Sequence, residues 1–175
     1  MNITFWKGAV IIFATRKSRR LVVFSLLLLP FLLQGCLGGT EYRAYPRAQT
    51  SVYTDIWNFS DHEIAADQVD ALYRRVARLM AITPEHSKPR PQVLVASPAY
   101  IQEKYLTIHP LAATRGGTAL AVYIPHQNQI LIPDFDRTLL THELAHYFTF
   151  HYLSIPRSGW EAIADHVVDA ERSAS

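Results

Sequence analysis

The chain has 175 residues and a formal net charge of +2, but its charges are unevenly distributed. Residues 1–35 hold 5 of the 17 basic residues and none of the 15 acidic residues, so the remainder has 12 basic against 15 acidic residues, or −3. A nucleic-acid partner is therefore not expected, because no basic stripe remains. The single cysteine excludes a disulfide framework and a cysteine-based zinc site.

The first predicted element is an N-terminal export signal. Residues 1–20 carry five basic side chains, and residues 21–33 (LVVFSLLLLPFLL) form an apolar run of thirteen that ends shortly before Cys36. Thirteen residues suit the apolar region of a signal peptide, with an uncleaved membrane anchor as the alternative. The end of the run resembles the lipobox of bacterial lipoproteins, in which the cysteine is lipidated. This resemblance implies a signal peptide over residues 1–35, palmitate on Cys36, and attachment to a membrane of the bacterial cell envelope on its periplasmic side.

Between the anchor and the folded domain, the sequence predicts a tether. Residues 36–59 contain glycines, tyrosines and scattered polar residues without a clear period. Ser60 followed by Glu63 has the pattern of a capping box, and apolar residues then recur at three- to four-residue steps. The domain is therefore expected over residues 60–175, beginning with an amphipathic helix over 60–81. The arginines of this helix are interpreted as a solvated face; they are Arg74, Arg75 and Arg78.

Three short apolar runs predict a small mixed β-sheet. The first is residues 92–97 (QVLVAS), which is bounded by prolines and followed by a short helix and a loop. In that loop His109 is interpreted as a surface residue. Residues 118–124 and 129–132 are the other two predicted strands, and the first of them is expected at an edge of the sheet. Its backbone is a candidate to hold an extended peptide by strand addition. The candidate peptide-binding residues are Ala119, Ala121 and Tyr123.

The next stretch, THELAHYFTFH (residues 141–151), places two histidines and a glutamate on an apolar helix predicted near residues 137–151. His142 and His146 are four residues apart and therefore lie on one helical face. The H-E-x-x-H spacing suits a zinc ion held by both histidines, with Glu143 as the general base for an attacking water. Because the helix is apolar nearly all round, it is expected to be buried, and unpartnered polar side chains there would be costly.

A catalytic zinc usually takes three protein ligands, so a third is expected downstream. The candidates are His151, Glu161, Asp165 and His166. His151 follows His146 by five residues with no glycine between them, whereas metzincins place a third histidine six residues on, after a glycine. His151 and His166 are interpreted as ordinary histidines, because neither has ligand spacing.

Glu161 fits better as the third ligand. Residues 154–159 (SIPRSG) read as a turn, after which a second helix can fold back against the first. Asp165 lies four residues after Glu161 on the same face, where its carboxylate can accept a hydrogen bond from the far nitrogen of a zinc-bound histidine. The alternative for Glu161 is a capping box with Ser158, in which its carboxylate satisfies the N-terminus of the second helix.

HELAH, the proline-containing connection and W-E-A-I-A-D (residues 160–165) together resemble the gluzincin clan of zinc metallopeptidases. Thermolysin-like members have H-E-x-x-H and a downstream glutamate with an aspartate four residues later, and two strands precede their active-site helix. The resemblance covers about residues 90–170. It implies a zincin-like α+β fold: a small mixed sheet, an N-terminal backing helix, the H-E-x-x-H helix and a following glutamate-bearing helix. It also implies a minimal form, whose local candidates for the oxyanion-binding residue are Tyr123, Tyr147, Tyr152 and His166.

The resemblance implies a peptidase that hydrolyses peptide bonds with Zn²⁺ on His142, His146 and Glu161. Its partners would be a peptide or protein substrate and, through Cys36, the membrane. The alternative is a non-catalytic zinc-binding lipoprotein that acts as a binding or assembly factor in the envelope. Glu143 favours the enzyme, because a structural zinc site needs ligands but no general base.

Overall fold

The computed structural model describes residues 42–114 and 116–174. The expected signal peptide over residues 1–35 and the expected lipid anchor at Cys36 lie outside the described residues. Within the described part of the chain, no helix combines the length and the apolar character needed to cross a membrane.

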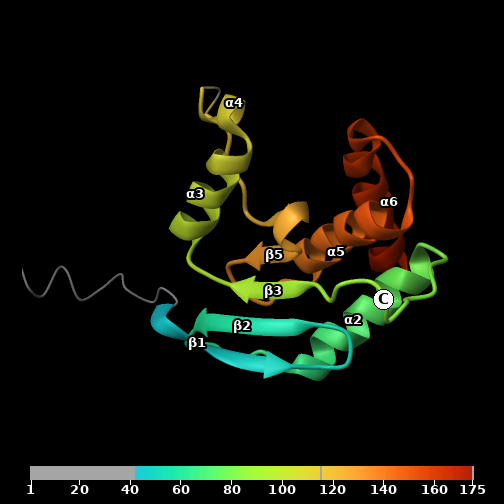
Figure 1. The fold of residues 1–175 in the computed structure, drawn as a ribbon, viewed down its shortest axis with the longest axis horizontal. Helices are drawn as coiled ribbons and strands as arrows, with labels where there is room; N and C mark the ends of the chain where they lie inside the picture. Colours follow the sequence, from blue (N-terminus) through green and yellow to red (C-terminus); the bar gives the residue numbers. More distant parts are fainter. Residues whose placement is uncertain (1–41, 115, 175) are drawn as a thin grey trace, which may run out of the picture. The chain divides into compact units, whose positions relative to one another are not determined.

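The described residues form a mixed five-stranded sheet with helices on both faces (Figure 1). The elements in chain order are β1 (Tyr42–Thr50), β2 (Asp55–Ser60), α2 (Ala66–Leu79), β3 (Gln92–Val95), α3 (Pro98–Ile108), α4 (Pro110–Ala113), β4 (Val122–Ile124), the 3₁₀ turn η1 (Pro125–Gln127), β5 (Gln129–Ile132), α5 (Arg137–Tyr152), η2 (Arg157–Gly159) and α6 (Trp160–Ser173). The strand order is β1-β2-β3-β5-β4, with β2, β3 and β5 parallel and both edge strands antiparallel to their neighbours. The predicted α+β class is confirmed at this level.

The sheet separates two apolar cores because successive side chains of its central strands point to opposite faces. Val93 and Val95 of β3 pack with α2, α5 and α6 in the larger core. Leu94 points the other way and packs with Ile101 of α3 in the smaller core. The strands β3 and β5 lie within the predicted ranges 92–97 and 129–132.

The first hairpin differs from the expected tether. Residues 42–50 and 55–60 are strands β1 and β2, and β2 joins the sheet beside β3. The strand pattern of β2 is obscure in the sequence because two of its three buried side chains are polar: Asn58 and Ser60 are buried with Ile56. Asn58 provides the hydrogen-bond acceptor for both polar groups of Ser60. The Asn58 Oδ1 accepts from the Ser60 backbone N–H at 2.9 Å and from the Ser60 Oγ at 2.8 Å.

The helix after the hairpin also begins later than expected. Ser60 ends β2 rather than capping a helix, and α2 starts at Ala66 without a side-chain cap. The buried Asp70 of α2 ties the helix to the β1–β2 turn, because its carboxylate accepts from the backbone N–H groups of Val52 at 3.0 Å and Tyr53 at 3.2 Å. A carboxylate in this position fixes the hairpin against the helix layer.

Candidate metal centre

The centre is built on α5 and the start of α6, which pack against each other. α5 begins where Asp136 Oδ1 accepts from the Leu139 backbone N–H at 2.9 Å, and it ends at Tyr152, four residues before Pro156. As the uninterrupted apolar pattern predicts, its middle is buried, including Leu140, Leu144 and Phe148. The connection through η2 then returns the chain so that α6 begins beside the middle of α5.

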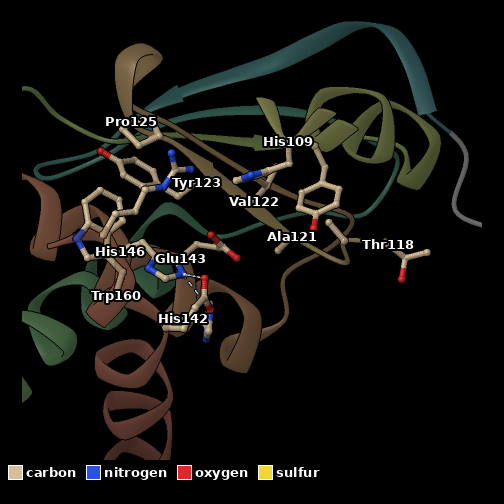
Figure 2. A pocket seen from close by; sticks show the side chains of 14 residues that line it. His109, Thr118, Ala121, Val122, Tyr123, Pro125, His142, Glu143, His146 and Trp160 are labelled. Carbon is tan, nitrogen blue, oxygen red and sulfur yellow. Dashed lines mark hydrogen bonds and ion pairs between the residues drawn. The ribbon is translucent and has the colours of Figure 1, made fainter. Parts of the chain in front are cut away.

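The structure brings His142, His146 and Glu161 together (Figure 2). The Nε2 atoms of the two histidines lie 3.1 Å apart. Glu161 places Oε2 3.2 Å from His142 Nε2 and Oε1 3.5 Å from His146 Nε2. Glu161 does not cap α6 with Ser158, because the N-cap is Gly159 and no side chain caps the helix.

These three side chains fit a tetrahedral zinc ion. Zinc bonds to histidine nitrogen and carboxylate oxygen are about 2.0–2.2 Å, which requires ligand atoms roughly 3.3–3.6 Å apart at the tetrahedral angle. The 3.1 Å between the two Nε2 atoms and the 3.2 Å from His142 Nε2 to Glu161 Oε2 lie close to that spacing, and one ligand atom from each of the three side chains lies within 4.8 Å of the others. Two imidazole nitrogens and one carboxylate oxygen also form the ligand set of many catalytic zinc sites.

Burial sets the protonation of the α5 side chains. His146 is 8% exposed, and burial holds its pKa well below the ordinary value, although the Glu161 carboxylate opposes this shift. A neutral imidazole is the form that binds a metal. Burial raises the pKa of the Glu143 carboxyl to about 8; Glu161 adds to the rise and a hydrogen bond from the Tyr123 backbone opposes it.

Asp165 lies where the sequence places it, behind the first histidine. Its Oδ1 is 3.6 Å from His142 Nδ1, the nitrogen that faces away from Glu161. A carboxylate at this nitrogen favours the tautomer that leaves the lone pair of Nε2 directed at the centre.

Asp165→Asn is therefore expected to weaken zinc binding by about 10- to 100-fold, as loss of such an orienting carboxylate does. Competition with a chromophoric chelator measures the change. Asp169→Asn is the matched control, because Asp169 is one turn further along α6 and lies 4.0 Å from Arg172 rather than beside a histidine. Equal losses in both variants would contradict an orienting role for Asp165.

Two hollows meet at the centre. One cavity of about 300 Å³ extends from Trp160 and Arg157 past Glu143 to His109 and Tyr105. A second, of about 530 Å³, lies toward Leu120, Leu139 and the exposed face of α6. The two share Ala121, His142 and Glu143 as lining residues, so the centre is open on both sides.

The predicted peptide-binding residues Ala119, Ala121 and Tyr123 all line the first cavity, but less of this edge is free than expected. β4 covers only Val122–Ile124 instead of residues 118–124. The side chain of Gln102 holds the preceding segment to α3, since its Oε1 accepts from the Ala119 backbone N–H at 3.0 Å and its Nε2 donates to Gly117 O at 2.9 Å.

The predicted oxyanion candidates are directed elsewhere. The hydroxyl of Tyr123 lies 3.1 Å from His151 Nε2, that of Tyr147 donates to Pro89 O, and that of Tyr152 accepts from the Glu85 backbone N–H. His166 is exposed on α6 and does not line either cavity at the centre. His151 is likewise used away from the ligand group, since its Nε2 also lies 3.0 Å from Asn128 Oδ1.

The sequence indicates a surface position for His109, but the structure partly buries it. It joins α3 to α4 and lines the first cavity, on the wall that faces Glu143 and His142 in Figure 2. Burial lowers its pKa, the Arg157 charge adds to the effect and Glu161 opposes it, so the neutral imidazole with one N–H donor is favoured. The only sequence signal was its place in a loop, where binding residues are common.

Among the described residues, His142, His146 and Glu161 are the group of histidine and acidic side chains whose ligand atoms lie within 4.8 Å of one another. No family model, curated protein or solved structure matches the chain.

Proposed function

We propose that the chain is a zinc-dependent peptidase of the bacterial cell envelope, with a zincin-like fold of the minimal gluzincin type. The observation that carries the proposal is the grouping of three zinc-type ligands with a buried glutamate on the wall of one cavity. Zinc held by His142, His146 and Glu161 would supply a Lewis acid that polarises a carbonyl and lowers the pKa of water. A site that only stabilises the fold would not need Glu143.

The protein groups then divide the remaining work. Glu143 takes a proton from the attacking water and delivers it to the leaving amine, and its carboxyl is oriented by the Tyr123 backbone. His109, on the facing wall, donates its N–H to the oxygen that becomes negative in the transition state. Trp160 lines the cavity beside His146, with its Nε1 fixed by a 3.1 Å hydrogen bond to Ile155 O.

The form of the cavities favours cleavage within a chain rather than at its end. Because both hollows share Ala121, His142 and Glu143, a peptide has room to continue on each side of the bond beside Glu143. The proposed signal peptide and acylated Cys36 would hold this site at a membrane surface, where its substrates would be envelope peptides or proteins.

The proposal is tested with peptides blocked at both ends by acetyl and amide groups. The full chain, purified in a non-ionic detergent, is expected to cut internal bonds of such a peptide mixture, to stop when a zinc chelator is added, and to recover with added zinc. Mass spectrometry identifies the products. Cleavage of free-ended peptides alone would limit the site to chain ends, and cleavage that survives chelation would contradict a zinc peptidase.

A further inference from the structure

A second cavity of a different chemical kind lies away from the metal centre, between α2 and the start of α5. Its volume is about 440 Å³, and it shares no lining residue with the two cavities at the centre. The residues that line it are Gln68, Ala71, Leu72, Arg75, Arg78, Phe135 and Arg137. The wall therefore contains three arginines and no carboxylate.

A buried carboxylate behind the wall holds two of these arginines in place. Glu171 of α6 is 5% exposed, and its Oε1 lies 3.1 Å from Arg75 Nε and accepts from Arg137 Nε at 2.7 Å. Its backbone oxygen also accepts from Arg75 Nη2 at 3.3 Å. Arginines ordered in this way are pre-organised, so less side-chain entropy is lost when they bind a ligand.

The cavity keeps a positive charge after this pairing. Three guanidinium groups face one carboxylate, which leaves an excess of two positive charges among these residues. Arg78 is exposed near the end of α2, and its side chain has no hydrogen bond or ion pair to another residue in the described ranges. The N–H donors of Arg78 are therefore available to an anion. The sequence alone does not distinguish Arg78 from the other arginines of the solvated face predicted for this helix.

We propose that this cavity binds a phosphate-bearing ligand. Guanidinium groups bind phosphate through paired N–H donors, and the excess of two positive charges accommodates a phosphodiester with one negative charge or a phosphate monoester with about 1.5–2 at neutral pH. The cavity is larger than a phosphate group, and Leu72, Ala71 and Phe135 give it an apolar side that suits the organic part of an ester. The ligand is a free phosphate ester or the headgroup of an anionic phospholipid.

Isothermal titration of the full chain in non-ionic detergent distinguishes these sources. The probes are glycerol 3-phosphate for a free ester, dihexanoyl phosphatidylglycerol for a headgroup, and dihexanoyl phosphatidylcholine as the zwitterionic control. Arg78→Gln is expected to weaken binding of the correct probe about tenfold or more, since a charged hydrogen bond contributes about 1.5–3 kcal/mol. Ala71→Glu, which adds a carboxylate at an exposed position of the wall, is expected to abolish it.

Arg74→Gln is the matched control, because Arg74 is on the same helix and carries the same charge but does not line the cavity. Binding of glycerol 3-phosphate that depends on Arg78 and not on Arg74 assigns a free ester, and the same pattern with phosphatidylglycerol assigns a headgroup. Thermal unfolding without ligand is expected to be unchanged in Arg78→Gln. Absence of binding by both anionic probes, or equal losses in Arg74→Gln and Arg78→Gln, would overturn the proposal.

Discussion

Glu143→Gln is expected to lower kcat/KM for an end-blocked peptide by about 10³-fold, within the range that a general base contributes. The substitution keeps the size of the side chain and removes its ability to take a proton. Because Glu143 is not one of the three side chains that meet at the centre, zinc content and thermal stability are expected to stay near those of the wild type. Rates measured at equal zinc occupancy separate loss of the base from loss of the metal.

Glu103→Gln is the matched control for that substitution, because Glu103 is exposed on α3 and lines neither cavity at the centre. The same pair of variants distinguishes an enzyme from a binding or assembly factor in cells. If the protein is an enzyme, Glu143→Gln reproduces the defect of a deletion strain. A wild-type phenotype from Glu143→Gln, in cells where the deletion is defective, would instead support the binding factor.

Glu161→Ala is expected to weaken zinc binding by more than about 100-fold, beyond the 10- to 100-fold typical of residues that only orient a ligand. The reason is geometric, since the Glu161 carboxylate reaches both histidine Nε2 atoms, at 3.2 and 3.5 Å. Its side chain is 75% exposed, so its removal is not expected to disturb the core. Competition with a chromophoric chelator measures the affinity, and thermal unfolding checks the fold.

Two histidines serve as controls for the ligand assignment. His151 lies on α5 beside Tyr123 and Asn128, and His166 is exposed on α6. His151→Ala and His166→Ala are therefore expected to retain zinc affinity within a few fold of the wild type. Equal losses in Glu161→Ala and in both histidine variants would reject Glu161 as the third ligand.

The residues of the centre were predictable because their relation is local. Four-residue spacing places His142 and His146 on one helical face in any α-helix. A turn before Trp160 then leaves little freedom for where the next helix can place Glu161 and Asp165. The apolar surroundings of the motif likewise predict a buried α5, and the structure has both helices at these positions.

Other features depend on contacts that no local pattern encodes. Strand β2 was not predicted because two of its buried positions hold Asn58 and Ser60 instead of apolar residues. These two side chains can be buried because Ser60 donates hydrogen bonds to Asn58 Oδ1. The position of His109 depends on how α3 packs on the far side of the sheet, more than thirty residues before the motif. The directions of the Tyr123, Tyr147 and Tyr152 hydroxyls depend on distant partners.

The most direct test of the zinc peptidase is a titration of the metal-free full chain with zinc while the cleavage rate of an end-blocked peptide is measured. The rate is expected to rise in proportion to added zinc and to level off at about one zinc per chain, as one three-ligand site requires. Glu161→Ala is expected to need far more zinc to reach any rate. A rate that is independent of zinc, or that keeps rising well beyond one equivalent, would contradict the proposed centre.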